Sequence, residues 1–343
     1  MKLLNRSGRT VYAGGILACA LACMPAIVAH ADERAESGVV QIIVPFGTGG
    51  GADSLGRETA RLLAGVLSAP INIVNVSGAS GNKGIGKLIN SAADGRTLAV
   101  LTADTFSVLA YANPGWKEAD VIPLGILVQQ PSALFLPENG RLKTWSDFEK
   151  EARLRPESLR VAISGLGSPD YLMLQQLAAK GIKLAPVPLS NPEERYRAVL
   201  EGKADALYEQ PGDVRALVEG KQIRPVLVLN GTRLLEYKDV PTSRELGFGD
   251  GQGQFRAIVV KTGTATEKVR ALSDAIDKVA AMPQFQAFLE TQNALKDSYV
   301  PANGATNYLH GKLEAMKKIV DSLPLHARYI IDETEVQAWV DTF

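Results

Sequence analysis

The chain has 343 residues, enough for one large or two ordinary α/β domains with a substantial core. Its 37 basic side chains balance its 37 acidic ones, and this zero net charge argues against nucleic acid, whose binding favours a strongly basic face. Only three histidines and two cysteines are present, so zinc sites and Ser-His-Asp triads begin with few candidates.

The first 31 residues have the pattern of a secretion signal. Three positive side chains within the first nine residues precede a mostly apolar stretch over 11–27, and Ala29-His30-Ala31 has the small-x-small spacing of a cleavage site. We expect cleavage after Ala31, which would leave 34 basic and 37 acidic side chains, a net charge of −3. Both cysteines leave with the signal, so the predicted product is a disulfide-free protein of the periplasm.

Two other interpretations of this segment compete with cleavage. A membrane anchor would need roughly 20 apolar residues, whereas this stretch is shorter and is interrupted by Pro25. A lipoprotein would use Cys19, but the apolar run before that cysteine is very short. Both are therefore disfavoured.

Short apolar runs alternate with stretches of helical spacing in the first part of the mature chain. The runs lie at 39–44, 71–76 and 97–102. This β-α-β-α-β order predicts a parallel sheet with right-handed crossovers.

The alternation restarts after two further apolar runs at 121–128 and 133–136. Thr144 with Asp147, Ser168-Pro169 and Asn191-Pro192 each predict a helix start. Strands of this second set are expected at 159–163, 185–189, 204–208 and 223–229. We expect these elements to form a second lobe.

A last apolar strand is expected at 255–260, followed by helices over 266–281, 284–292 and 303–323. No polar linker is long enough to separate independent domains, so we predict an α/β fold of two lobes, each a mostly parallel sheet flanked by helices. Segments near 129–141 and 247–253 would cross between the lobes and leave a cleft. The assignment is 32–140 for the first part of lobe 1, 141–253 for lobe 2, and 254–343 for the return to lobe 1 and the C-terminal helices.

A glycine-rich loop follows the first predicted strand. The sequence Pro45-Phe46-Gly47-Thr48-Gly49-Gly50-Gly51-Ala52-Asp53 opens a helix, so free backbone N–H groups and the helix dipole converge on one point. That geometry favours an anion, although a plain turn capped by Asp53 has the same pattern. The dinucleotide fingerprint Gly-x-Gly-x-x-Gly fails. A similar loop recurs at 164–169 in the other lobe, so the two loops could clamp a carboxylate at each end.

Residues 81–88 approach a phosphate-binding P-loop. They match it except at Leu88, where a Ser or Thr hydroxyl must hold Mg²⁺. Leu88 instead shares an apolar helix face with Ile85 and Ile89, so nucleotide hydrolysis is disfavoured.

Four acidic residues stand at or near predicted strand ends: Asp104, Asp170, Glu209 and Asp213. A carboxylate pair for acid–base catalysis and a set of helix caps or turn residues are both consistent with these positions. Arg256 lies inside an apolar strand and needs a partner, either a ligand carboxylate or a buried acid.

Several motifs together are more specific than any one of them. They are Pro45-Phe46, Gly49-Gly50, Asp53 with Arg57 and Arg61, 78–86, Asp94-Gly95-x-Thr97-Leu98, 164–168, Gly202-Lys203-Ala204-Asp205, Asp239-Val240-Pro241-Thr242 and Leu246-Gly247. With these motifs the chain resembles the tripartite tricarboxylate transporter receptors, the TctC/Bug family, over nearly all of 39–323.

The resemblance implies a periplasmic-binding-protein fold whose lobes close on a small organic anion, often a di- or tricarboxylate, and deliver it to inner-membrane permease subunits. In relatives the two glycine loops hold a ligand carboxylate through backbone groups and water, and the positions of 102–105 and 209–210 contact the rest of the ligand. The candidate ligand-binding residues are Phe46, Gly47, Thr48, Gly49, Gly50, Asp53, Thr102, Asp104, Thr105, Ser164, Gly165, Gly167, Ser168, Glu209, Gln210 and Arg256. We expect a monomer without catalytic residues, metal, cofactor or nucleic-acid partner.

The chain departs from the family pattern at two acidic positions. Many relatives carry a small neutral residue where Asp104 stands and an Asp where Glu209 stands, so this cleft is expected to be more acidic than usual. Because like charges repel a dianion, either these carboxylates point away or the ligand brings hydroxyl or amino donors. A Trp common in relatives is also replaced around Gln254-Phe255-Arg256, and 324–343 extends beyond the usual end.

Three functions would share this cleft. A receptor binds its ligand stoichiometrically and returns it unchanged, whereas a secreted hydrolase or lyase using Asp104 and Glu209 would consume it. A ligand-sensing domain for a membrane kinase would differ only in its outer surfaces. We take the receptor as the primary hypothesis.

Overall fold

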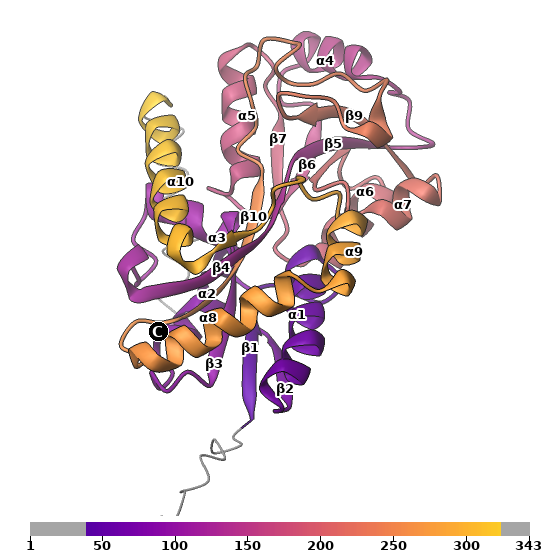
Figure 1. Cartoon of the computed structure of the whole chain (residues 1–343). Coiled ribbons are helices and arrows are strands. Elements are labelled where there is room, and N and C mark those ends of the chain that lie inside the picture. The colour runs from indigo at the N-terminus through magenta and orange to yellow at the C-terminus, as the bar shows by residue number, and fades with distance from the viewer. Residues whose placement is uncertain (1–38, 324–343) are drawn as a thin grey trace, which may run out of the picture. The chain divides into compact units, whose positions relative to one another are not determined.

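Two β-sheets, each flanked by helices, make up the fold (Figure 1). The computed structural model describes residues 39–323, which belong to one compact unit. The predicted signal segment with its cleavage after Ala31, and the extension 324–343, lie outside the described residues. The predicted α/β fold of two lobes is confirmed, each lobe being one sheet with its helices.

The first sheet has six strands in the order β11-β4-β10-β3-β1-β2. They are β1 (Val40–Val44), β2 (Ile71–Asn75), β3 (Thr97–Thr102), β4 (Val121–Gln130), β10 (Gln254–Lys261) and β11 (Val300–Pro301). β1, β2 and β3 are parallel, as the alternating pattern predicts. β10 runs antiparallel between β3 and β4, because the chain returns to this sheet along a strand from the other lobe.

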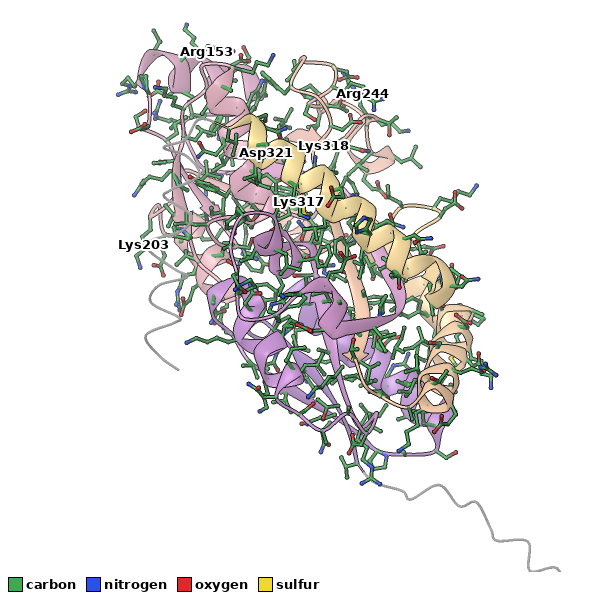
Figure 2. The ribbon with its side chains drawn as sticks, turned by 90° about the vertical axis from the view of Figure 1, so that its left-hand side faces the viewer. Arg153, Lys203, Arg244, Lys317, Lys318 and Asp321 are labelled. Carbon is green, nitrogen blue, oxygen red and sulfur yellow. The ribbon has the colours of Figure 1, made fainter. Side chains whose placement is uncertain are left out.

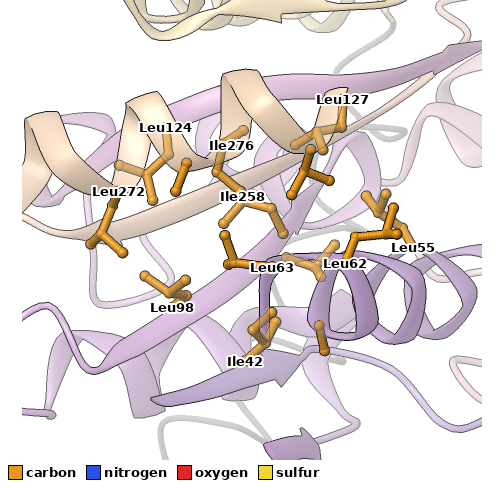
Figure 3. Packing of buried hydrophobic residues seen from close by; sticks show 14 of the residues in the cluster. Ile42, Leu55, Leu62, Leu63, Leu98, Leu124, Leu127, Ile258, Leu272 and Ile276 are labelled. Atoms are coloured by element: carbon orange, nitrogen blue, oxygen red, sulfur yellow. The ribbon is translucent and has the colours of Figure 1, made fainter. Parts of the chain in front are cut away.

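Helices cover both faces of the first sheet. They are α1 (Gly51–Leu67), α2 (Asn82–Ile89), the short α3 (Ala103–Ser107), α8 (Thr266–Ala280), α9 (Pro283–Thr291) and α10 (Ala302–Ser322). Ile42 packs with Leu63 of α1 and Ile276 of α8 on one face (Figure 3), whereas Ile43 packs with Leu313 of α10 on the other. Neighbouring strand residues point to opposite faces, so a strand covered on both sides needs a continuous apolar run.

The second sheet has five strands in the order β7-β6-β8-β5-β9. They are β5 (Ser132–Pro137), β6 (Arg160–Ile163), β7 (Ala185–Pro188), β8 (Ala206–Glu209) and β9 (Ile223–Leu229). β7, β6 and β8 are parallel, whereas β5 is antiparallel to both of its neighbours. Both sheets are therefore mixed, each with a parallel part of three strands.

The helices of the second lobe begin where their caps predict. They are α4 (Trp145–Leu154), α5 (Pro169–Ala179), α6 (Pro192–Leu200) and the short α7 (Arg215–Glu219). Thr144 forms a capping box with Asp147, and the side chains of Ser168 and Asn191 accept hydrogen bonds from backbone N–H groups in the first turns of α5 and α6. The sequence signals for these three helix starts are confirmed.

Within residues 39–323 the chain crosses between the sheets twice. β4 leads through Pro131 directly into β5, and the return runs through residues 230–253 between β9 and β10. β5 lies before the predicted boundary at 140, yet it pairs with β8 and β9 of the second sheet. The exchange of sheets therefore falls at Pro131, within the segment where a crossing is expected.

Many charged side chains lie on the outside of the molecule, as Figure 2 shows for Arg153, Lys203, Arg244 and Lys318, all of which are exposed. Among residues 39–323, none of the helices combines the length and apolar character needed to cross a bilayer.

Candidate ligand-binding site

A pocket lies where the carboxyl ends of β1, β3, β6 and β8 meet from the two sheets. Its empty volume is about 380 Å³, which includes space open to solvent. Its lining residues are Phe46, Gly50, Gly51, Ala52, Thr102, Asp104, Ser164, Asp170, Pro192, Arg195, Glu209, Gln210, Asp213, Gln254 and Arg256. The carboxyl ends of parallel strands are where open α/β sheets bind ligands.

The N-termini of α1 and α6 approach each other at this pocket. A β carbon at Gly50 would lie 2.5 Å from Cγ of Pro192, the first residue of α6. Glycine therefore lets the backbone of α1 come close to the opposite lobe. Both helix ends carry partial positive charge, but they differ in their donors. The first turn of α1 has no side-chain cap, whereas α6 begins with Pro192, which has no N–H, and the Glu193 N–H is bonded to Asn191. An anion in the pocket would therefore be stabilised mainly by the backbone N–H groups of α1.

Arg256 extends from β10 and forms a buried ion pair with Asp213 of the second lobe. Its guanidinium also donates hydrogen bonds to the side chains of Gln130 and Gln210, and only 3% of the Arg256 side chain is exposed. Of the two partners that the sequence left open for Arg256, the structure shows the buried acid. Burial raises the pKa of Asp213 to about 6, although Arg256 opposes the shift.

The two carboxylate oxygens of Asp213 differ. Oδ2 accepts from Arg256, whereas Oδ1 is buried and has no hydrogen-bond partner. A buried acceptor without a donor costs folding free energy, so this atom is a position where a ligand donor would be stabilised.

A second buried ion pair joins Arg195 of α6 to Glu209 at the end of β8. Their Nη2 and Oε2 atoms are 2.6 Å apart, and the two side chains are 7% and 5% exposed. Arg195 also donates to the carbonyl oxygen of Leu189. Burial alone would lower the pKa of Arg195, but the adjacent Glu209 more than offsets it, so the pKa lies above its ordinary value.

Two further carboxylates share the hydroxyl of Ser164. Ser164 Oγ lies 2.8 Å from Asp104 Oδ1 and 2.7 Å from Asp170 Oδ2. Burial raises the pKa of Asp104 and raises that of Asp170 well above its usual value, to which the charge of Asp104 contributes. A hydroxyl carries one hydrogen, so it can donate to one carboxylate only and must accept from the other. Protonation of one carboxyl would supply the second donor of this contact, in keeping with the raised pKa values.

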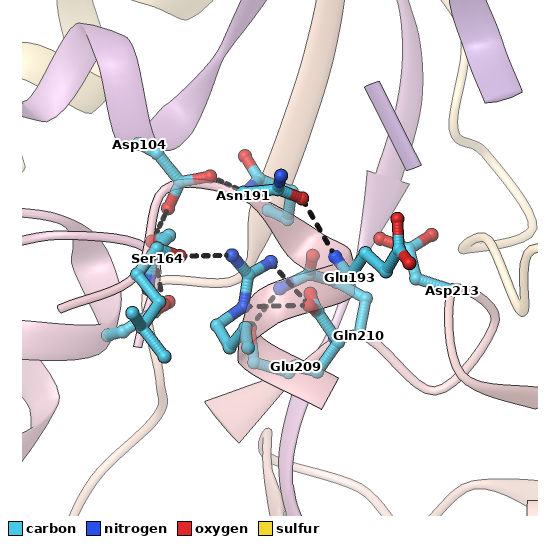
Figure 4. A network of polar contacts seen from close by, with 12 residues as sticks. Asp104, Ser164, Asn191, Glu193, Glu209, Gln210 and Asp213 are labelled. Atoms are coloured by element: carbon cyan, nitrogen blue, oxygen red, sulfur yellow. Dashed lines mark hydrogen bonds and ion pairs between the residues drawn. The ribbon is translucent and has the colours of Figure 1, made fainter. Parts of the chain in front are cut away.

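Figure 4 shows how these groups are arranged. Asp104 and Ser164 lie at one end of the network and Asp213 at the other, with Glu209 and Gln210 between them. The amide of Gln254 donates to Asp104 Oδ2 at 2.6 Å and its oxygen accepts from the backbone N–H of Ala103. The network therefore links the end of β3 with the ends of β6 and β8.

Half of the residues expected to bind ligand line this pocket. They are Phe46, Gly50, Thr102, Asp104, Ser164, Glu209, Gln210 and Arg256. Asp104 and Glu209, the two acids that depart from the family pattern, thus face the cleft and do not point away from it. Each has a partner within the protein, Arg195 for Glu209, and Ser164 with Gln254 for Asp104.

The other candidates lie outside the lining. They are Gly47, Thr48, Gly49, Asp53, Thr105, Gly165, Gly167 and Ser168. Asp53 accepts hydrogen bonds from the Gly49 backbone and from Arg57 and Asn75. Burial alone would raise the pKa of Asp53, but these bonds hold it below its usual value. Asp53 therefore fixes the loop that precedes α1.

The second glycine loop is covered by the first lobe. Ser107 Oγ donates to the carbonyl oxygen of Gly167 at 2.7 Å, and the Tyr111 hydroxyl donates to that of Leu166 at 3.2 Å. The hydroxyl of Ser168 is used in capping α5. The start of α6 therefore faces the N-terminus of α1 across the pocket, and the loop at 164–168 contributes Ser164 to its lining.

Sequence reasoning left out seven lining residues: Gly51, Ala52, Asp170, Pro192, Arg195, Asp213 and Gln254. Asp170 and Asp213 lie near predicted strand ends, but a role as helix caps or turn residues explains their positions in the sequence equally well. The sequence contains only a weak indication that Arg195 is buried: its spacing places it on the same helix face as Pro192 and Val199, and this face is buried in the structure. Its partner Glu209 is distant in sequence, so the ion pair has no local pattern.

Metal ligation has no support in the described part of the chain. Residues 39–323 contain no group of three His, Cys, Asp or Glu side chains placed to hold a metal ion. The acidic side chains of the pocket instead form hydrogen bonds and ion pairs with arginine, serine and glutamine side chains.

Comparisons with known proteins agree with this architecture. A UPF0065 protein of Cupriavidus necator is 24% identical over 319 residues, covering 92% of this chain and 96% of the relative. BugT of Bordetella pertussis is 25% identical over 260 residues, covering 72% and 79%. Among solved structures, the periplasmic binding protein BugD superposes with a TM-score of 0.77 at 20% identity, covering 82% of this chain and 96% of BugD.

The malate-bound MatC of Rhodopseudomonas palustris has a TM-score of 0.75 at 23% identity, covering 82% of this chain and 98% of MatC. A sequence model described as the tripartite tricarboxylate transporter family receptor, TctC, matches residues 55–325. Because the match spans both lobes, the chain belongs to the TctC family of tripartite tricarboxylate transporter receptors.

Proposed function

We propose that this receptor captures a small organic acid in the pocket between its two sheets and delivers it to inner-membrane permease subunits. The observation that carries the proposal is the meeting of the N-termini of α1 and α6 at a pocket with buried polar lining. MatC with malate and an R. palustris protein with adipate, both of similar fold, support a carboxylate ligand. Export with cleavage after Ala31 is part of the proposal.

The receptor binds its ligand without catalysing a reaction. It functions as a monomer. A hydrolase or lyase would need Asp104 or Glu209 free to exchange a proton with substrate. Asp104 instead accepts hydrogen bonds from Ser164 and Gln254, and Glu209 is paired with Arg195. Capture occurs by movement of the lobes about the crossings at Pro131 and 230–253.

A thermal-shift screen against carboxylates, amino acids and aromatic acids tests the proposal. Because a ligand that binds the folded state raises the unfolding midpoint by mass action, one chemical class should give a clear shift. Mass spectrometry should then recover that compound intact and in stoichiometric amount. Conversion of the compound would instead establish the enzyme that uses Asp104 and Glu209.

A further inference from the structure

The pocket contains more negative than positive side chains. Its ionisable lining residues are four acids, Asp104, Asp170, Glu209 and Asp213, and two bases, Arg195 and Arg256. With every group ionised these side chains carry a charge of −2. A dicarboxylate would bring two more negative charges into this low-dielectric space.

Both arginines already have a carboxylate partner. Arg195 is paired with Glu209, and Arg256 is paired with Asp213. Among the lining residues, all of which the structure describes, no further cation remains for a second ligand carboxylate. A ligand carboxylate can be met by the backbone N–H groups at the N-terminus of α1, opposite the start of α6, but these suit one such group.

The remaining two acids form neither of these ion pairs, although the positive charge of Arg195 opposes the rise in the pKa of Asp104. Both Asp104 and Asp170 contact the hydroxyl of Ser164, which can donate to only one of them. The Gln254 amide also donates to Asp104, and the Ser164 backbone N–H also donates to Asp170. Without ligand, a bound proton relieves the repulsion between the two carboxylates. A cationic group of the ligand would do the same.

Asp213 supplies an independent observation. Its side chain is 2% exposed and lines the pocket, yet its Oδ1 has no hydrogen-bond partner. The atom is an acceptor with formal negative charge, so the group that it fits is an N–H donor with positive charge. A hydroxyl would satisfy the hydrogen bond but would leave the surplus charge of the pocket unchanged.

We infer that the ligand is a zwitterionic amino acid, whose protonated amine is bound by Asp213 and the adjoining carboxylates while its carboxylate lies at the N-terminus of α1. This inference rests on the proposed function, because it presumes that the pocket holds a small organic acid. It decides between the hydroxyl and amino donors that the sequence leaves open.

Isothermal titration of the full chain, freed of bound solutes by unfolding and refolding, tests the inference with matched pairs. The probes are lactate against alanine, malate against aspartate, 2-hydroxyglutarate against glutamate, and succinate as a dicarboxylate without a donor. In the pair that binds, the amino compound should have a Kd lower by at least about tenfold, since a charged hydrogen bond replaces a neutral one.

The variant Asp213→Asn provides a second readout on the same probes. It keeps an oxygen acceptor and removes the charge, so the preference for the amino compound over its hydroxy partner should fall by about tenfold or more. A purely structural role would weaken both compounds equally and leave their ratio unchanged. Asp274→Asn, an exposed position on α8, is the matched control and should leave the ratio as it is.

The outcomes separate the two proposals. Tighter binding of amino compounds with a ratio that falls in Asp213→Asn supports both. Equal or tighter binding of hydroxy acids or succinate overturns the amino-acid inference and leaves the organic-acid receptor standing. Silence of all seven probes with a well-folded protein overturns both.

Discussion

Gly51 shows at the scale of a single residue how the pocket depends on a missing side chain. A β carbon there would overlap the Arg256 guanidinium and the Asp213 carboxylate. Gly51→Ala should therefore raise the ligand Kd by about tenfold or more, while alanine at the start of α1 preserves the helix. Gly65→Ala in the same helix is the control, since a β carbon there meets nothing within 4 Å and the residue is exposed. Equal affinities of the two variants would remove Gly51 from the site.

The contribution of the Arg256–Asp213 ion pair to stability can be measured with a double-mutant cycle. Arg256→Ala leaves Asp213 buried without its cation and should lower the free energy of unfolding by about 3–5 kcal/mol. Adding Asp213→Asn removes the uncompensated charge, so the double variant should be more stable than Arg256→Ala alone. Urea denaturation of the four proteins measures the coupling. If the two changes simply add, the ion pair does not exist in solution.

The residues that sequence could not place are those whose meaning depends on a distant partner. Gly50 can be recognised from the local sequence, because a glycine between a buried strand and a helix start lets the backbone N–H groups of the helix approach a ligand. Arg195 cannot be recognised in this way, because it meets its partner Glu209 only in the folded protein, where β8 lies beside α6. Asp213 likewise has the pattern of an ordinary turn residue until the return strand brings Arg256 against it.

At the scale of elements, the start of α5 separates capping from binding. Ser168 caps the helix and lies outside the pocket, whereas Ser164 lines it. Ser168→Ala should lower the free energy of unfolding by about 1 kcal/mol and leave the ligand Kd within about twofold. Ser164→Ala removes the hydroxyl shared by Asp104 and Asp170 and should raise the Kd by about fivefold or more.

Titration calorimetry and urea denaturation of both variants check this division. Thr144→Ala, which removes the cap of α4 on the outside of the second lobe, is a stability control for Ser168→Ala. A large loss of affinity in Ser168→Ala would return Ser168 to the ligand-binding residues, as the family resemblance implies.

Elements were easier to predict than their pairing. Buried strands such as β3 and β9 have apolar runs that end where the strands end, and the caps of α4, α5 and α6 are local signals. The antiparallel position of β10 between β3 and β4 has no such signal. It depends on where the chain comes from after leaving the other lobe, which is a property of the path and not of the strand.

For the whole molecule, the acidic pocket sets a dependence of stability on pH. Burial raises the pKa values of Asp104 and Asp170, and raises that of Asp213 to about 6. A raised pKa of an acid means that the folded protein binds protons more tightly than the unfolded chain. The resulting stability is fully present below the unfolded pKa near 3.8 and is lost as the pH rises through the folded value.

The ligand-free protein should consequently be more stable at pH 5 than at pH 7. The shift of Asp213 alone corresponds to a change on the order of 3 kcal/mol across its whole range, of which a little under half, about 1 kcal/mol, falls between these two pH values. Acids with lowered pKa values, such as Asp53 and Asp205, stay ionised in this window and contribute no opposing slope. Below about pH 4 their protonation should reverse the trend.

Urea denaturation at pH 5, 6 and 7 measures how the free energy of unfolding depends on pH. The variant Asp213→Asn shows how much of that dependence comes from the Asp213 carboxyl. The variant has no carboxyl at this position, so its free energy of unfolding should vary less between pH 5 and 7 than that of the unaltered chain. Parallel pH profiles for the two proteins would show that the Asp213 carboxylate keeps its ordinary affinity for protons, and with it that the pocket is not the low-dielectric acidic site described above.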